Sequence, residues 1–260
     1  MKQLKAVTIY GTGLIGGSLG LALKRAFPDI RIAGVDRPEV LKRALELKII
    51  DVAGNHPADV IILAAPIGEI LRLVDEISAG DALVTDAGST KAAICERAAQ
   101  RGLRFIGGHP MAGQEHSGPE AADASLFEGA PFFLCHVRST PADATGTMES
   151  LIKAIGAVPH TISPDDHDRL VAQISHLPQI ISSVLAGQTA AHRNVAGPGL
   201  RSMTRLAASP VHVWRDIFKT SGSLPSELRS FIQRLQTILN SMEAGDFDEI
   251  EKLFKPGGSD

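Results

Sequence analysis

Apolar, β-branched runs alternate with helical patterns through the first part of the chain. The runs occupy residues 6–10, 31–36, 59–66, 82–88 and 103–108. This alternation predicts βαβ units, and therefore a parallel sheet covered by helices. Residues 132–137 and 157–163 predict further strands, with a helix between them near residues 142–155.

From Pro164 onward the strand pattern fades and long helical patterns replace it. The first helix begins with Ser-Pro-Asp-Asp, which is typical of a helix N-terminus, and we expect Pro178 to bend it. Residues 227–254 predict another long helix. We therefore expect an α/β Rossmann-like domain over residues 1–163, followed by an all-α domain over residues 164–260.

Composition and charge favour a globular protein. Of 260 residues, 44% are hydrophobic and 21% charged, and the net charge is −3. We expect no nucleic-acid partner and no membrane partner, because there is no basic patch and the longest apolar run, residues 60–67, is too short to span a bilayer. Cys95 and Cys135 lack CxxC spacing, and no signal-like segment precedes the first strand. We expect reduced core thiols in a cytoplasmic protein.

A glycine motif follows the first predicted strand. Gly11, Gly13 and Gly16 have GxGxxG spacing, and Asp36 ends the second strand. Such glycines permit a tight turn, a close approach of backbone to a pyrophosphate, and close packing of helix on strand, although an ordinary tight turn is the alternative. We assign the cofactor site to Gly11, Thr12, Gly13, Leu14, Ile15, Gly16, Asp36, Arg37, Ala65 and Pro66.

Asp36 and Arg37 bear on the choice of dinucleotide. A carboxylate at this place accepts hydrogen bonds from the adenosine ribose hydroxyls, which favours NAD. The neighbouring Arg37 can stack on adenine or meet a 2′-phosphate, so NADP remains possible. A dinucleotide site in such a domain implies hydride transfer.

A second glycine-rich segment, GGHPMAGQEHSG at residues 107–118, follows the fifth predicted strand. Ligands bind at the carboxyl ends of parallel strands, so we expect Ser89 and His109, each in a loop after its strand, to face one crevice. We expect the glycines to let the backbone approach cofactor or substrate. His109 is the candidate general base. Ser89 is the candidate to orient the imidazole, although a helix N-cap would explain this serine equally well.

Two segments of the helical part also contain candidate site residues. Residues 167–179 include His176, and residues 197–217 include Arg201 and Arg205. An arginine guanidinium can bind the carboxylate of an anionic substrate with two hydrogen bonds. The alternative is that Arg201 and Arg205 are ordinary surface residues.

Five segments, taken in order, resemble the prephenate/arogenate dehydrogenase family of tyrosine biosynthesis. They are GTGLIGGSLG, DAGSTK, GGHPMAGQEHSG, HDRLVAQISHLP and GLRSMTRLAASPVHVWRDI. The resemblance, which is to the short monofunctional form, implies a C-terminal helical domain that forms a homodimer. It also implies an oxidative decarboxylation without a metal. Hydride leaves ring carbon C4 for the nicotinamide, the ring carboxylate leaves as CO₂, and the ring becomes aromatic.

The resemblance also implies roles for single residues. His109 would accept the proton of the substrate 4-hydroxyl, as suits a neutral imidazole with a pKa near the working pH. Ser89 would orient His109, Arg205 would grip a substrate carboxylate, and His176 would line the substrate pocket.

One position departs from the family pattern. Many relatives have histidine after SHLP, where this chain has Gln179. Prephenate carries a ketone on its side chain and arogenate an ammonium, so we assign Gln179 and Gln114 to substrate binding. Arogenate, prephenate or both remain open as substrates.

Two other functions compete with this interpretation. Another dehydrogenase with a Rossmann-like and a helical domain, of the β-hydroxyacid or pyrroline-carboxylate reductase kind, would share the first glycine motif but not GGHPMAGQEHSG. A non-catalytic dinucleotide sensor would keep Asp36 but would not need His109, Ser89 and Arg205 together.

Overall fold

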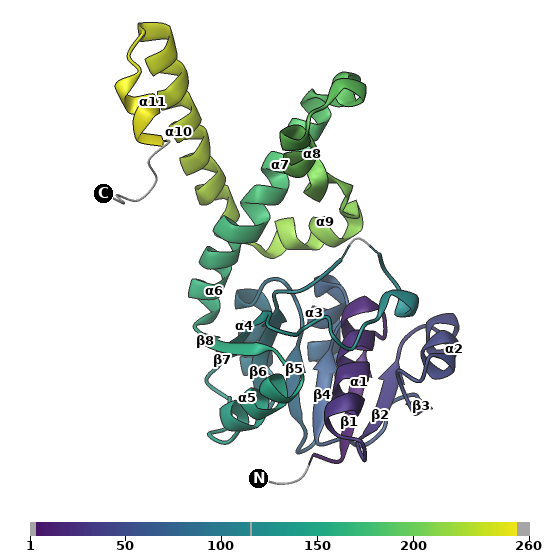
Figure 1. Cartoon of the computed structure of the whole chain (residues 1–260). Helices are drawn as coiled ribbons and strands as arrows, with labels where there is room; N and C mark the ends of the chain where they lie inside the picture. The colour runs from purple at the N-terminus through teal and green to yellow at the C-terminus, as the bar shows by residue number, and fades with distance from the viewer. Residues whose placement is uncertain (1–3, 115, 254–260) are drawn as a thin grey trace.

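The computed structural model describes residues 4–114 and 116–253. Eight strands form one sheet in the order β3-β2-β1-β4-β5-β6-β7-β8 (Figure 1). The strands are β1 (Ala6–Tyr10), β2 (Arg31–Val35), β3 (Val52–Ala53), β4 (Val60–Leu63), β5 (Leu83–Asp86), β6 (Phe105–Pro110), β7 (Pro131–His136) and β8 (Val158–Ile162).

Strand direction follows the prediction up to β6. Strands β1 to β6 are parallel to their neighbours, whereas β7 runs antiparallel to β6 and β8 is parallel to β7. The α/β fold class is confirmed, and the sheet is mixed rather than wholly parallel. The two-residue β3 escaped prediction because it is too short to show a hydrophobic period.

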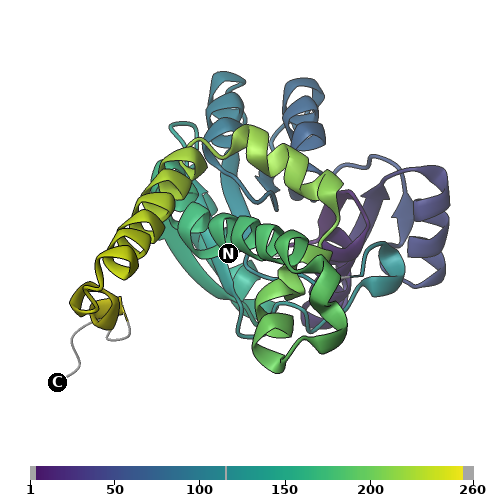
Figure 2. The ribbon, with the colours of Figure 1, turned by 90° about the horizontal axis from the view of Figure 1, so that it is seen from above.

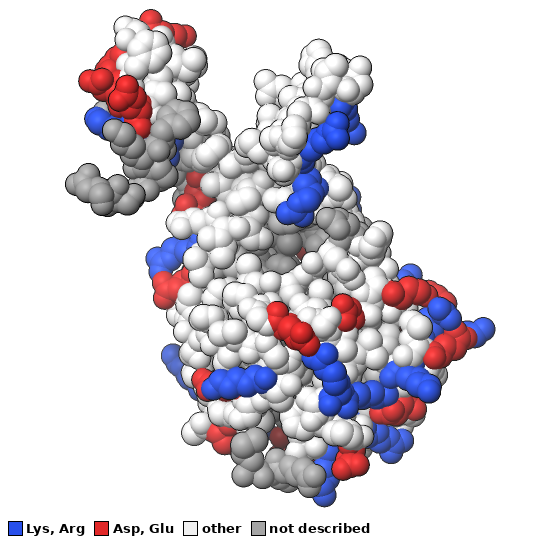
Figure 3. All heavy atoms as spheres, in the orientation of Figure 1, with Lys and Arg blue, Asp and Glu red and all other residues white. Residues whose placement is uncertain are grey.

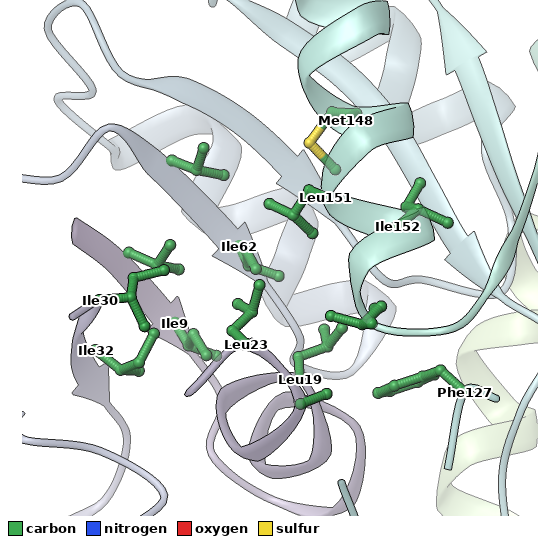
Figure 4. Packing of buried hydrophobic residues seen from close by; sticks show 14 of the residues in the cluster. Ile9, Leu19, Leu23, Ile30, Ile32, Ile62, Phe127, Met148, Leu151 and Ile152 are labelled. Atoms are coloured by element: carbon green, nitrogen blue, oxygen red, sulfur yellow. The ribbon is translucent and has the colours of Figure 1, made fainter. Parts of the chain in front are cut away.

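Helices cover both faces of this sheet (Figure 1). They are α1 (Leu14–Ala26), α2 (Pro38–Glu46), α3 (Ile67–Glu76), α4 (Ala92–Gln100) and α5 (Ala144–Ala154), and a short turn η1 covers Pro119–Ala121. On one face, residues of α1 and α5 such as Leu23 and Ile152 pack on Ile9 and Ile62 (Figure 4). On the other face, α3 and α4 pack on residues such as Val84. The central strands are covered on both sides, which is why their sequences are almost wholly apolar.

The chain after β8 is helical. Its elements are α6 (Pro164–Val171), η2 (Ala172–His176), α7 (Leu177–Gln188), η3 (Ala190–Val195), α8 (Pro198–Thr204), η4 (Arg205–Ala208), α9 (Val211–Thr220), α10 (Leu224–Ala244) and α11 (Asp248–Leu253). In Figure 1, α7 with α8 and α10 with α11 rise from the sheet as two diverging arms, and α9 crosses between them and the sheet. Figure 2 shows α9 lying over the edge from which both arms rise.

Pro178 does not break its helix. The segment from α6 to α7 is continuous, and η2 between them is a turn of π-helix. Proline has no N–H and cannot make the α-helical bond to the residue four positions earlier, and a wide turn accommodates this loss. His176 lies in the widened turn.

The predicted long helix near the C-terminus divides in two. Gly245 has φ +69° and ends α10, after which α11 begins at Asp248. A residue in this left-handed region closes a helix, and glycine adopts it without steric cost.

The sheet ends at Ile162 and α6 begins at Pro164. Ser163 caps α6, and its side chain accepts a hydrogen bond from the Asp166 N–H at 3.1 Å. The division into two domains at this point stays a prediction, and residues 254–260 of the second domain lie outside the described residues.

One helical stretch in the described part of the chain, Pro164–Gln188, is long and apolar enough to cross a membrane by length and composition. Its polar residues His167, Asp168 and His176 are buried against the rest of the protein.

Candidate active site

The loop after β1 meets the end of β4, between the two strands where the order of the sheet reverses. Gly11 has φ +90°, and a Cβ there would lie 2.4 Å from the Ala64 carbonyl oxygen. A Cβ on Gly16 would lie 1.8 Å from the Gly11 carbonyl oxygen, whereas a Cβ on Gly13 would meet nothing within 4 Å. Packing within the protein therefore requires glycine at positions 11 and 16, whereas Gly13 faces open space.

The start of α1 suits a pyrophosphate. No side chain caps this helix, and its first turn contains no acidic residue. The first N–H groups of Leu14, Ile15 and Gly16 are thus left to a ligand, and the helix dipole favours an anion there. The open space above Gly13 is where such a group would fit, so the residues present fit a dinucleotide.

Asp36 braces the glycine loop. Its Oδ2 accepts a hydrogen bond from the Thr12 N–H at 2.7 Å, and its Oδ1 accepts one from the Arg37 N–H at 2.8 Å. Oδ2 also accepts from the Thr12 hydroxyl at 3.4 Å, and Oδ1 has a second lone pair left for a ribose hydroxyl. Arg37 is exposed and pairs with Glu39 at 3.5 Å. Ala65 and Pro66 follow β4 beside the loop, and Pro66 precedes the first residue of α3.

His109 lies inside β6 rather than in a loop after it, where it pairs with Phe133 of β7. The loop prediction was wrong because two glycines and a proline hide the strand period. The glycines also serve another purpose than the predicted approach to a ligand. A Cβ on Gly108 would lie 2.4 Å from the Asp86 carbonyl oxygen, and one on Gly107 would lie 2.8 Å from Cys95 Sγ. They let β6 pack closely against β5 and α4.

A buried ion pair fixes the backbone beside His109. The Lys91 ammonium binds the Asp86 carboxylate, and both side chains are fully buried. Lys91 Nζ also donates to the Gly108 carbonyl at 2.8 Å, while the Asp86 carboxylate accepts the N–H groups of Gly88 and Gly108. Such a pair is stable when its remaining hydrogen bonds are made, as they are here.

His109 belongs to a row of buried polar side chains. Its Nδ1 lies 2.9 Å from His167 Nε2, and His167 Nδ1 lies 2.8 Å from Asp168 Oδ1. Burial, followed by the charges of His167, Lys91 and His176, lowers the pKa of His109 well below its usual range. The pKa therefore lies below the value expected from the sequence, and the ring is neutral and able to accept a proton.

Ser89 is half-buried between β5 and α4. Among the described residues, the structure records no hydrogen bond between its hydroxyl and His109. The Nδ1 atom of His109 instead makes a hydrogen bond with His167. This partner was not predicted from the sequence. The role of Ser89 in orienting the imidazole stays a prediction.

His176 is buried and only half satisfied. Its Nδ1 lies 3.0 Å from Ser221 Oγ, and its ring stands edge-on to Trp214. Its Nε2 is buried without a hydrogen-bond partner in the described structure. Burial lowers the pKa of His176 to about 4. A buried polar atom without a hydrogen-bond partner destabilises the protein. A ligand that makes this hydrogen bond would remove the penalty.

Gln179 links α7 to η4. Its side-chain amide donates to the Leu206 carbonyl at 2.8 Å, and the nearby Ser182 Oγ accepts the Ala207 N–H at 3.1 Å. Arg205 is the first residue of η4 and its side chain is exposed. Gln179 therefore holds the turn that carries the predicted carboxylate-binding arginine.

Gln114 lies in the segment after β6. Its side-chain amide donates to the Ala121 carbonyl at 2.5 Å and its side chain is exposed. The same segment includes residue 115, which is outside the described residues. A substrate contact of Gln114 stays a prediction.

Helix α9 is joined to the carboxyl edge of the sheet. The Gly68 N–H at the start of α3 donates to Asp216 Oδ2 at 3.1 Å, and the hydroxyls of Thr90 and Thr220 are 2.7 Å apart. These contacts hold α9 at that edge, and Trp214 of α9 stands edge-on to His176. Fold and site together define a dinucleotide-dependent dehydrogenase of the Rossmann-like kind.

Comparison with known proteins is consistent with that class. Residues 19–160 match the family model described as the prephenate dehydrogenase nucleotide-binding domain, and residues 163–256 match that of the prephenate dehydrogenase dimerization domain. The prephenate dehydrogenase of Lactococcus lactis subsp. cremoris (strain MG1363) is 35% identical over 98% of this chain and 76% of its own length. The chain belongs to the prephenate dehydrogenase family. It is an NAD(P)-dependent oxidoreductase, and the resemblance seen in the sequence is confirmed.

Two solved structures have the same fold over nearly the whole chain. The prephenate dehydrogenase of A. aeolicus, solved in complex with hydroxyphenyl propionate and NAD⁺, has a TM-score of 0.90 and is 27% identical, covering 97% of this chain and 96% of its own. The arogenate dehydrogenase of Synechocystis has a TM-score of 0.80 and is 29% identical, covering 96% of each chain.

Proposed function

We propose that this protein oxidatively decarboxylates a cyclohexadienyl substrate of tyrosine biosynthesis, prephenate, arogenate or both. The observation that carries the proposal is the buried, neutral His109 at the carboxyl edge of the sheet, with the unpartnered Nε2 of His176 nearby. The family match and the names of the two solved relatives support the substrate class.

The reaction needs a base for the substrate hydroxyl. A bound nicotinamide would supply the acceptor for the hydride of ring carbon C4. As the hydride leaves, the C4 oxygen becomes carbonyl-like and its proton passes to the His109 imidazole, which burial keeps neutral beforehand. Loss of the ring carboxylate as CO₂ then restores aromaticity.

Substrate binding falls to the helical part. Arg205 pairs with a substrate carboxylate, and His176 Nε2 gains the hydrogen bond that it lacks in the protein alone. Gln114 and Gln179 are the candidates near the side-chain end of the substrate. Ser89 completes the set by orienting His109 or the reacting hydroxyl.

The glycine loop would hold the dinucleotide. The N–H groups of Leu14 and Ile15 would bind the pyrophosphate, and Asp36 would accept from the adenosine ribose. NAD is the favoured cofactor because Asp36 would repel a 2′-phosphate, and Arg37 leaves NADP possible.

We further propose a cytoplasmic homodimer that forms through the helical part. The matched family model is named for dimerization. Large apolar side chains are exposed on α7, α8, α9 and α10. In Figure 3 the arm of α10 and α11 also carries Asp and Glu toward its tip, and the arm of α7 and α8 carries Lys or Arg near its base. An exposed apolar area of this kind marks an interface.

One assay tests the activity. The reduced nicotinamide is followed at its absorbance maximum with prephenate and arogenate in parallel, each with NAD and with NADP. We expect turnover with NAD and at least one of the two substrates, and loss of turnover in His109→Asn with NAD binding retained. No turnover with any pairing, in a protein that binds NAD, would refute the proposal and favour a sensor or another dehydrogenase.

A further inference from the structure

Three buried side chains from different elements form one continuous hydrogen-bonded row. His109 of β6 contacts His167 of α6 at 2.9 Å, and His167 contacts Asp168 at 2.8 Å. All three are buried, and the His167 ring has no exposed surface. The row leads from the proposed base to the start of α4.

Asp168 defines the far end of the row. Its Oδ1 accepts the Lys91 N–H at 2.7 Å and its Oδ2 accepts the Ala92 N–H at 3.0 Å, at the start of α4. A carboxyl group that accepts from backbone N–H groups on both oxygens, at a helix N-terminus, is held as the carboxylate. It can therefore only accept from His167 Nδ1.

This end fixes the proton positions along the whole row. His167 must carry its hydrogen on Nδ1, and burial lowers its pKa, so the ring is neutral and its Nε2 is an acceptor. His109 must then donate from Nδ1. The lone pair of His109 is left on Nε2, which makes no hydrogen bond within the described structure.

We propose that His167 and Asp168 are positioning residues that hold His109 in the Nδ1–H tautomer and so present its unprotonated Nε2 to the substrate hydroxyl. The inference rests on the proposed function for its consequence, but the tautomer itself is a property of the protein alone. Neither residue touches the reacting atoms.

The row also stabilises the positive charge that develops on His109 during the reaction. When the substrate O–H bond breaks, a new N–H bond forms at His109 Nε2 and the ring becomes an imidazolium. Its Nδ1–H then donates more strongly to His167, whose own Nδ1–H donates to the Asp168 carboxylate. The titratable groups that act on His109 are His167, Lys91 and His176, and behind them Asp168 contacts His167 and Asp86 contacts Lys91.

A purely structural role is the alternative. Asp168 joins α6 to the start of α4, and loss of either residue could loosen that contact without any effect on the tautomer. Two amide substitutions of His167 distinguish the positioning role from the structural role. In His167→Gln the amide reaches the position of the imidazole Nε2, while in His167→Asn it is one methylene shorter and reaches Asp168 but not His109.

The first experiment measures kcat, KM and the NAD dissociation constant of the wild type and both variants. We expect kcat of His167→Asn to fall about 100-fold or more, with KM and NAD binding changed little, and kcat of His167→Gln to be at least about tenfold higher than that of His167→Asn. Equal kcat values in the two variants would overturn the proposal. Inactivity of the wild type with both substrates would refute the proposed function instead.

The second experiment does not depend on activity. Long-range ¹H–¹⁵N correlation spectra of the wild-type imidazoles, assigned by the missing signals of His109→Asn, distinguish the two neutral tautomers. We expect His109 and His167 both to carry hydrogen on Nδ1 at neutral pH. Hydrogen on Nε2 of His109 would overturn the inference, whatever the kinetics show.

Discussion

The Gly11 carbonyl oxygen lies where a side chain on Gly16 would have to begin, 1.8 Å from the position of its Cβ. The loop after β1 therefore folds back onto the first turn of α1. Gly13, between them, has no protein atom within 4 Å of its Cβ position. The motif thus contains glycines needed for two distinct reasons.

This difference predicts opposite outcomes for two alanine substitutions. Gly16→Ala should destabilise the protein by several kcal/mol, since the overlap is with backbone and cannot be relieved by a side-chain rotation. Gly13→Ala should leave the unfolding temperature within a few degrees of the wild type but weaken NAD binding about tenfold or more, because the methyl group occupies the pyrophosphate's space. Thermal unfolding and NAD titration measure both effects, and unchanged NAD affinity in Gly13→Ala would place the cofactor elsewhere.

The buried Lys91–Asp86 pair predicts a large loss of stability. Lys91→Met leaves the Asp86 carboxylate buried without its counter-ion and should lower the free energy of unfolding by about 3–5 kcal/mol. The exposed ion pairs of Arg72 make Arg72→Met a suitable control, with little expected change. Denaturant unfolding of both variants is the measurement, and similar midpoints for the two would contradict the argument.

The sequence was most informative where a local pattern has a local cause. The glycine spacing and Asp36 mark the loop after β1, and continuous apolar runs mark β1, β2, β4, β5 and the start of β6. The direction of β7 was not predictable, because the long connection after His109 returns to the sheet without a crossover helix. No pattern indicates such a return.

The row behind His109 was missed for a related reason. His167 and Asp168 were visible in HDRLVAQISHLP, but their partners are 58 and 77 residues away in sequence. Only the packing of α6 on α4 and β6 brings them together. Hydrogen bonds between distant segments leave no period in the sequence. The local sign of this row is the adjacent pair His167 and Asp168 in the first turns of a predicted helix.

The bond from Gln179 to the Leu206 carbonyl predicts an indirect effect on substrate binding. Gln179→Ala removes the link between α7 and η4 and should cost about 1–2 kcal/mol of stability. Because Arg205 begins η4, KM should rise for both substrates, and by a similar factor for prephenate and for arogenate. Steady-state kinetics with both substrates check this, with Ser183→Ala as a control that retains the Leu206 bond. A change for one substrate alone would instead favour direct contact with the substrate side chain.

His176 predicts a loss of stability in acid. Its folded pKa is about 4, whereas an unfolded histidine titrates near pH 6.5, so the unfolded state binds more protons between these values. The free energy of unfolding should fall as pH drops from about 6.5 to 4, by up to about 3 kcal/mol for this residue. His109 and His167 also have lowered pKa values and act in the same direction.

Urea unfolding at several pH values in this window tests the effect. In His176→Asn the fall in stability between pH 6.5 and 4 should be smaller, while the exposed His192→Asn should follow the wild type. If His176→Asn lost as much stability in acid as the wild type, His176 would not be the group responsible.

The exposed apolar side chains of α10 predict a dimer interface, and a charged substitution there should dissociate the dimer. Ile232, Leu235 and Leu239 are each about half exposed on one helix, and α10 leaves the sheet domain as a separate arm (Figure 1). Leu235→Glu would bury a carboxylate in a homodimer interface, which weakens association strongly. Leu45→Glu on α2 is the matched control, because Leu45 is comparably exposed but lies on the sheet domain. Sedimentation velocity should show a dimer for the wild type and Leu45→Glu and a monomer for Leu235→Glu, and a monomeric wild type would remove the basis of the proposed assembly.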